Sequence, residues 1–189
     1  MRLFLAINLP AAVRDRIFQD AEPLRAASAA VKWIAAPSLH VTLKFLGEQD
    51  ESRVEDIQRA VSGAVSMHAP FNVETTEFGA FPNFHRPRVV WLGMTAETRL
   101  RALAGDIDRA LAPLGFAPEA RAFQAHVTLG RVRGEMRLPD AKAVAQAAAL
   151  RLTRRAFPVR TVDLMRSELG PGGSRYSVVA AIPLHARGT

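Results

Sequence analysis

The chain has 189 residues and carries 25 Lys and Arg against 18 Asp and Glu, a formal net charge of +7. It contains no cysteine, which excludes disulfides, thiolate metal ligands and cysteine nucleophiles. Apolar residues make up 49% of the chain, enough to bury a core, so we expect residues 1–189 to form a single domain or two intimately packed lobes.

The positive charge is carried almost entirely by arginine. Guanidinium groups match phosphate oxygens, so the composition permits a nucleic-acid partner without requiring one. The apolar run at the N-terminus is broken by Asn8 and Pro10, and no stretch approaches the roughly 18 apolar residues of a membrane span. We therefore expect a soluble, cytoplasmic protein.

In the first half of the chain, an apolar run ends before Pro10, as in a strand buried on both faces. Apolar residues at helical spacing then alternate with strand-like runs. The predicted elements are a strand over residues 1–9, a helix over 13–24, strands over 31–34 and 39–47, and a helix over 54–65.

The second half repeats this order. Its predicted elements are strands over residues 71–78 and 88–94, a helix over 100–114 capped by Gly115, a strand over 125–133, an alanine-rich helix over 141–152, and strands over 159–168 and 176–183 around the hairpin loop LGPGGSR. Strand-helix-strand-strand-helix-strand, run about twice, predicts an α+β fold with internal duplication.

The tetrapeptide His-Val-Thr-Leu occurs twice, beginning at His40 and at His126, 86 residues apart (126 − 40). Both copies lie on predicted strands, where alternate side chains point to opposite faces. The two histidines should therefore lie on one face with Thr42 and Thr128, and the Val and Leu residues should enter the core. Such a pair predicts two imidazoles that face each other across a shared site.

Two imidazoles at one site suit general acid–base chemistry, because one removes a proton from an attacking oxygen while the other protonates the leaving oxygen. The hydroxyls of Thr42 and Thr128 would hold nonbridging oxygens of a phosphate, and Arg131 would add a charge-assisted contact. Arg131 has the opposite parity along its strand, so it needs a bulge near Gly130 or a position at the strand end to reach the site.

The segments HVTLKFLG and HVTLGR resemble the paired motifs of the 2H phosphoesterase superfamily, and most closely those of the RNA 2′,3′-cyclic phosphodiesterases, also called 2′-5′ RNA ligases. RLFLAINLP, FPNFHRPRVVWLG and LMRSELGPGGSRYSVVAAIPL agree with that family in the same order, so the resemblance covers essentially the whole chain. Ala125 departs from the proline that usually precedes the second motif.

The resemblance implies a bilobal, pseudo-two-fold α+β fold, in which mainly antiparallel sheets line a central cleft with helices outside. It also implies hydrolysis of 2′,3′-cyclic phosphate ends of RNA to 2′-phosphomonoesters without a metal or other cofactor. By the same resemblance, His40 is the proton donor, His126 the proton acceptor, and Thr42, Thr128 and Arg131 hold the phosphate.

Several alternatives stay open at this point. Phe45 and Tyr176 would stack on a base at the edge of the site, although Tyr176 equally fits a structural role in the hairpin. The substrate would be an RNA end, such as a transfer-RNA fragment, or a small cyclic nucleotide, and we expect a monomer. A non-catalytic RNA- or nucleotide-binding module is the alternative function, and ATP-independent 2′-5′ ligation would use the same two histidines with a 5′-hydroxyl in place of water.

Overall fold

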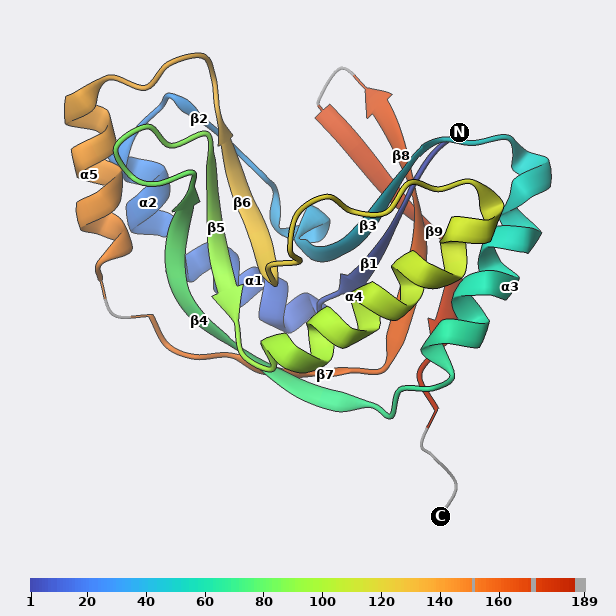
Figure 1. Cartoon of the computed structure of the whole chain (residues 1–189). Coiled ribbons are helices and arrows are strands. Elements are labelled where there is room, and N and C mark those ends of the chain that lie inside the picture. Colours follow the sequence, from blue (N-terminus) through green and yellow to red (C-terminus); the bar gives the residue numbers. More distant parts are fainter. Residues whose placement is uncertain (151, 171–172, 186–189) are drawn as a thin grey trace.

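A computed structural model of the chain describes residues 1–150, 152–170 and 173–185. Its main helices are α1 (Ala11–Asp20), α2 (Glu22–Ala27), α3 (Val54–Val65), α4 (Glu97–Leu111) and α5 (Leu138–Ala148). Its strands are β1 (Arg2–Asn8), β2 (Val31–Trp33), β3 (His40–Glu48), β4 (Phe71–Phe81), β5 (Val89–Met94), β6 (His126–Val132), β7 (Ala156–Val159), β8 (Thr161–Gly170) and β9 (Gly173–Pro183) (Figure 1).

The strands form one curled sheet in the order β7-β4-β5-β6-β3-β1-β8-β9, with β2 added beside β6. Neighbouring strands run antiparallel throughout this order. The order is symmetric about the central pair β3–β6, because β1 flanks β3 as β5 flanks β6, and β8 flanks β1 as β4 flanks β5. The predicted α+β class with internal duplication is confirmed.

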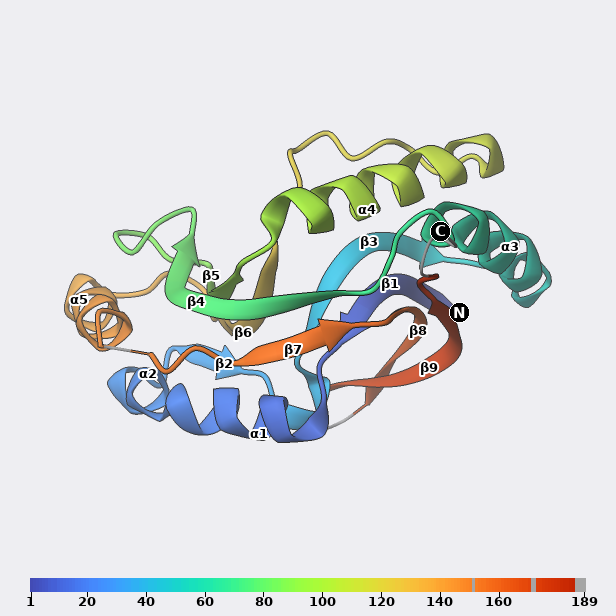
Figure 2. The same ribbon diagram turned by 90° about the horizontal axis from the view of Figure 1, so that it is seen from below.

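The helices form two separate groups, as the view from below shows (Figure 2). One group contains α1, α2 and α5, and the other contains α3 and α4. Each group therefore combines helices from both halves of the chain, since α2 follows β1 but packs on α5, and α4 follows β5 but packs on α3 and β3. This exchange interlocks the two halves around β3 and β6.

The helices and the sheet share one large core. Apolar residues at helical spacing face the sheet, as in α3, where Ile57, Val61 and Val65 are fully buried. Alternate residues of β1, beginning at Leu3, belong to this core. The residues between them face the other side, where Phe4 forms a small cluster with Ala6, Met165 and the half-buried Tyr176. The first strand is thus buried on both faces, as predicted.

Three expectations from the sequence are corrected. The predicted helix over residues 13–24 is two helices, because the chain breaks at Ala21 between α1 and α2. The alanine-rich helix covers 138–148 and not 141–152, since Pro139 is well accommodated in its first turn. The predicted strand over 159–168 corresponds to β8, except that Val159 ends a separate strand, β7, which pairs with β4 at the other end of the sheet. The tip of the predicted hairpin loop, residues 171–172, lies outside the described residues.

Across the described residues, none of the helices is both long enough and apolar enough to cross a membrane.

Candidate active site

The central strand pair brings the two histidine motifs together. Val41 of β3 pairs with Val127 of β6 in an antiparallel register. One residue away on either side, this register sets His40 opposite Thr128 and His126 opposite Thr42. The two histidines are diagonal neighbours, and on an antiparallel pair such residues lie about 7–8 Å apart along the backbone. Both imidazoles therefore lie close together on one face of the sheet.

All four polar side chains lie on the face of the sheet that the helices leave uncovered. The valines and leucines of both motifs are buried in the main core, whereas the histidines and threonines are half-buried. The ring of His40 lies 5.0 Å from the ring of Phe4, which belongs to the cluster on that same face. The alternation predicted from the sequence is therefore present in both motifs.

A bulge in each strand follows the motif. In β6, the register with β5 places Thr128 and Gly130 opposite consecutive residues and leaves Leu129 as an extra residue. In β3, the register with β1 is irregular at Leu43 in the same way. A bulge reverses the alternation of faces beyond it. Arg131 consequently returns to the face that carries His126, which is the irregularity that its parity required.

Each imidazole is anchored through the same atom. The Nδ1–H of His40 donates to the carbonyl oxygen of Ser38 at 2.8 Å, and the Nδ1–H of His126 donates to the carbonyl oxygen of Gln124 at 2.8 Å. A carbonyl oxygen only accepts, so Nδ1 carries the proton in both neutral rings. The Nε2 atom of each ring is then the one that accepts or donates a proton.

Both histidines have lowered pKa values. Burial lowers the pKa of His40, the carbonyl of Ser38 partly opposes this, and the charge of His126 lowers it further. Burial likewise lowers the pKa of His126, the carbonyl of Gln124 opposes this, and the guanidinium of Arg131 lowers it further. Both rings in the free protein are therefore neutral over a wider range of pH than an exposed histidine.

Aromatic side chains border each imidazole. Tyr176 meets His40 edge-on, with ring centroids 5.2 Å apart and planes at 85°. Phe81 meets His126 in the same manner at 5.1 Å and 84°. These contacts fix the ring planes and exclude water from one side of each histidine. Tyr176, predicted as a base platform, is half-buried against His40, whereas the side chain of Phe45 is 59% exposed.

Sequence reasoning missed a polar pair beside His40, which joins the half-buried Asn8 to the buried Asp163. Asn8, at the position of β1 opposite His40, donates from Nδ2 to Oδ2 of Asp163 at 2.7 Å. Asp163 is only 6% exposed, and its Oδ1 has no partner among the described residues. A polar residue at the end of an otherwise apolar strand was the available signal for Asn8. For Asp163, no pattern in the sequence separates it from an ordinary surface position of its strand.

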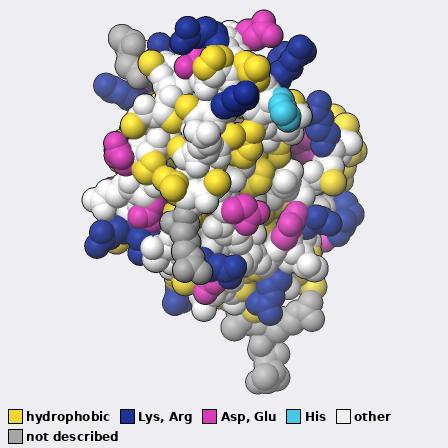
Figure 3. All heavy atoms as spheres, turned by 90° about the vertical axis from the view of Figure 1, so that its left-hand side faces the viewer, with side chains coloured by type: hydrophobic (Ala, Val, Ile, Leu, Met, Phe, Trp, Pro, Cys, Tyr) yellow, Lys and Arg dark blue, Asp and Glu magenta, His cyan; other side chains and the backbone are white. Residues whose placement is uncertain are grey.

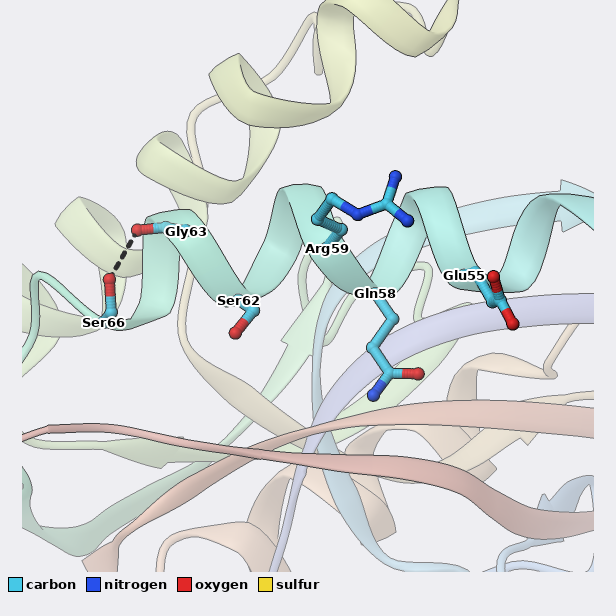
Figure 4. A pocket seen from close by; sticks show the side chains of 6 residues that line it. All are labelled: Glu55, Gln58, Arg59, Ser62, Gly63 and Ser66. Atoms are coloured by element: carbon cyan, nitrogen blue, oxygen red, sulfur yellow. Dashed lines mark hydrogen bonds between the residues drawn. The ribbon is translucent and has the colours of Figure 1, made fainter.

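The remaining histidines lie elsewhere. His68 Nε2 contacts Asp106 Oδ2 at 2.7 Å between α3 and α4, and His85 is exposed in the β4–β5 loop. Nowhere in the described ranges do three or more His, Cys, Asp or Glu side chains gather in a metal-binding arrangement. A shallow depression on α3, lined by polar side chains between Glu55 and Ser66, lies in the helix layer and not on the histidine face (Figure 4).

Comparison with known proteins agrees with this arrangement. The profile of the 2′-5′ RNA ligase superfamily matches residues 13–171. A protein of Methanothermobacter thermautotrophicus named RNA 2′,3′-cyclic phosphodiesterase is 34% identical over 177 residues, which are 94% of this chain and 95% of that protein. One of the same name from Methanocaldococcus jannaschii is 31% identical over 182 residues, 95% of this chain and 98% of that protein.

Solved structures share the fold over the whole chain. TT0787 of Thermus thermophilus superimposes with a TM-score of 0.79 at 29% identity, and both chains are covered completely. Escherichia coli LigT complexed with 3′-AMP superimposes with a TM-score of 0.72 at 27% identity, with 98% of each chain covered. The fold is that of the 2H phosphoesterases, and the chain belongs to the 2′-5′ RNA ligase superfamily.

Proposed function

We propose that this protein hydrolyses the 2′,3′-cyclic phosphate at an RNA end to a 2′-phosphomonoester and a free 3′-hydroxyl. A water oxygen forms a bond to phosphorus and gives its proton to Nε2 of His126. The bond between phosphorus and the 3′ oxygen breaks, and Nε2–H of His40 protonates that oxygen. Thr42, Thr128 and Arg131 hold the nonbridging oxygens, and the step needs no metal.

The single observation behind this proposal is the pair of identically anchored imidazoles. Both Nδ1–H groups are engaged by backbone carbonyls, so both Nε2 atoms are available for proton transfer on the same face of the sheet. A module that only binds RNA needs no such matched pair. The relatives named RNA 2′,3′-cyclic phosphodiesterase add support, because they align over nearly the full length of this chain.

One feature of the surroundings supports His126 as the base. A base must be neutral before the reaction, and the cation of Arg131 disfavours protonation of His126. The matching position beside His40 holds Phe45, which carries no charge. An anionic cyclic phosphate should raise the pKa of both rings, and the proposed mechanism places the proton that it attracts on His40, the acid.

An RNA oligonucleotide with a 2′,3′-cyclic end, incubated with the protein in EDTA, tests the proposal. We expect a 2′-phosphate product from the wild type and almost none from His40→Ala or His126→Ala. His185→Ala, which removes an exposed histidine after β9, is the matched control and should retain full activity. RNA binding without turnover would instead support a non-catalytic binding module.

The same site would also join RNA ends, an activity that the family description 2′-5′ RNA ligase names. A 5′-hydroxyl would take the place of water without ATP, and each histidine would keep its role, His126 taking the proton of the 5′-hydroxyl and His40 protonating the 3′ oxygen as its bond to phosphorus breaks. Because water is far more concentrated than any RNA end, hydrolysis should dominate. Product analysis with two RNA fragments held side by side on a complementary strand would measure the ratio of joined to hydrolysed ends.

A further inference from the structure

A strip of basic side chains continues from the candidate active site along β6. Lys32 of β2 pairs with Arg131 of β6, so their side chains project from the same face of the sheet. The adjacent pair, Val31 and Val132, packs against the core on the opposite face. Arg133 continues the ladder through its backbone N–H, which donates to the carbonyl of Ala30, and alternation returns it to the face of Arg131.

The three cations of this strip, Lys32, Arg131 and Arg133, are exposed, and no ion pair engages them within the described part of the chain. Some arginines on the helices differ, as Arg59 and Arg101 each pair with an acidic residue one turn away. Figure 3 shows Lys and Arg side chains at the upper end of the molecule, where β2 and the end of β6 lie in Figure 1, and also lower on the same face.

The other half of the site has no such strip. The position in β3 that matches Arg131 holds Phe45, and the position that matches Arg133 holds Gly47. No strand of the described residues pairs with β3 in the place that β2 takes beside β6. Of the two central strands, β6 therefore carries exposed cations beyond its motif and β3 does not.

We propose that Lys32, Arg131 and Arg133 form a β6 basic strip that binds the phosphodiester backbone of an RNA strand upstream of its reacting end. Arg131 lies next to the reacting phosphate, and Lys32 and Arg133 contact the phosphates before it. This inference rests on the proposed function and narrows its substrate class, because a strip outside the site favours RNA strands over cyclic mononucleotides. Phosphate contacts by exposed cations give affinity without base selectivity.

The test compares a short oligoribonucleotide that ends in a 2′,3′-cyclic phosphate with a 2′,3′-cyclic mononucleotide. In the double variant Lys32→Ala/Arg133→Ala, KM for the oligonucleotide should rise roughly tenfold, whereas kcat/KM for the mononucleotide should be unchanged. In a salt titration of binding, the slope of log K against log[salt] should become less steep by about 1.4, since each contact to a single strand contributes about 0.7.

The double variant Arg16→Ala/Lys142→Ala is the matched control, because it removes one exposed Arg and one exposed Lys from helices α1 and α5. An equal loss of oligonucleotide affinity in this control would show that only net charge matters and would contradict the proposal. An unchanged KM for the oligonucleotide in Lys32→Ala/Arg133→Ala, or an equal rise in KM for the mononucleotide, would also contradict it. The same holds if polyglutamate binds the wild type and loses as much affinity in the strip variant as RNA does.

Binding of a labelled oligoribonucleotide with an ordinary 3′-hydroxyl, followed by fluorescence anisotropy, separates this inference from the proposed hydrolysis. If the wild type hydrolyses neither cyclic substrate, the proposed function fails, and the anisotropy still measures whether Lys32 and Arg133 bind RNA. If the wild type hydrolyses both substrates and the two strip residues leave RNA binding unchanged, only the strip is wrong.

Discussion

Strands β3 and β6 carry the same His-Val-Thr-Leu sequence and the same bulge, yet the residues beyond the bulge differ. On β3 the next side chain on the site face is Phe45, near Phe4, which in turn contacts Tyr176. On β6 it is Arg131, beside Lys32. One flank of the candidate site is therefore aromatic and the other cationic, although both imidazoles are held in the same way.

The bulges themselves show a second difference. In β3 the residue after the extra leucine is Lys44, which is buried, contacts Asp108 of α4 and donates to the carbonyl of Ala117 at 2.9 Å. In β6 it is Gly130, where an added Cβ would lie 2.5 Å from Cγ1 of Val31 and 2.8 Å from Cε3 of Trp33. A duplicated backbone thus supplies matched imidazoles, and divergence at equivalent positions gives each a different neighbourhood.

The largest expected effect comes from removing either imidazole. His40→Ala and His126→Ala should each lower kcat/KM about 10²–10⁴-fold, and the double variant should lose little more, because acid and base act together. In the wild type, kcat/KM should fall at low pH as His126 gains a proton and at high pH as His40 loses one. Since both pKa values lie below the ordinary 6.5, the maximum should lie below pH 6.5.

The two single variants also separate the roles, provided that residual activity is measured across the pH range. His126→Ala should lose the decline at low pH and keep the decline at high pH, and His40→Ala should do the opposite. The reverse pattern would exchange the acid and base assignments while leaving the proposed reaction intact. Circular dichroism spectra matching the wild type would verify that both variants are folded.

The next largest effect concerns Arg131 and its counterpart Phe45. Arg131→Gln should lower kcat/KM about 100-fold through the lost contact to the phosphate. Because the cation lowers the pKa of His126, its removal should raise that pKa and move the low-pH decline to higher pH. Phe45→Arg should place a cation near His40, lower its pKa, and move the high-pH decline to lower pH.

These two shifts are measured from the pH dependence of kcat/KM with a cyclic mononucleotide, which does not depend on the β6 basic strip beyond Arg131. A low-pH decline that stays in place in Arg131→Gln would mean that the guanidinium does not act on the base. Arg131→Lys keeps a charge and should show the smaller shift of the two Arg131 variants, although it lacks the planar fork that binds two phosphate oxygens.

A moderate effect on stability is expected where β2 meets β6. Gly130→Ala should lower the free energy of unfolding by about 1–3 kcal/mol, because the new methyl group collides with Val31 and Trp33. Gly63→Ala is the matched control, since an added Cβ there meets nothing within 4 Å in helix α3, and it should raise stability by about 0.5–1 kcal/mol. Urea unfolding of both variants checks the contrast, and equal stabilities would contradict it.

Much of this arrangement was predictable from local patterns. The 3.6-residue spacing in α3 and α4 and the two His-Val-Thr-Leu strands reflect which face of each element enters the core. The two-residue alternation placed the histidines and threonines on a common face. The same alternation puts Arg131 on the opposite face, so the sequence predicted a bulge, and both central strands contain one.

Other features depend on contacts between distant segments, and no local pattern determines them. The pairing of Val41 with Val127 sets how the two motifs are offset, yet it joins residues 86 positions apart (127 − 41). The exchange of helices between the halves and the contact between Asn8 and Asp163 also join segments that are far apart in the sequence. Tyr176 was left open between two roles, and only the fold places it against His40.

The smallest expected effect belongs to the aromatic flank. If the exposed ring of Phe45 stacks on the terminal base, Phe45→Ala should raise KM about fivefold with little change in kcat, since exposed stacking is worth about 1 kcal/mol per base. The loss should be larger for cyclic purine than for cyclic pyrimidine nucleotides, and Phe45→Trp should reverse it. Leu169→Ala removes an even more exposed apolar side chain from β8 and should leave KM unchanged. A KM that is independent of the base in both the wild type and Phe45→Ala would mean that the aromatic flank supports His40 through Phe4 without binding the base itself.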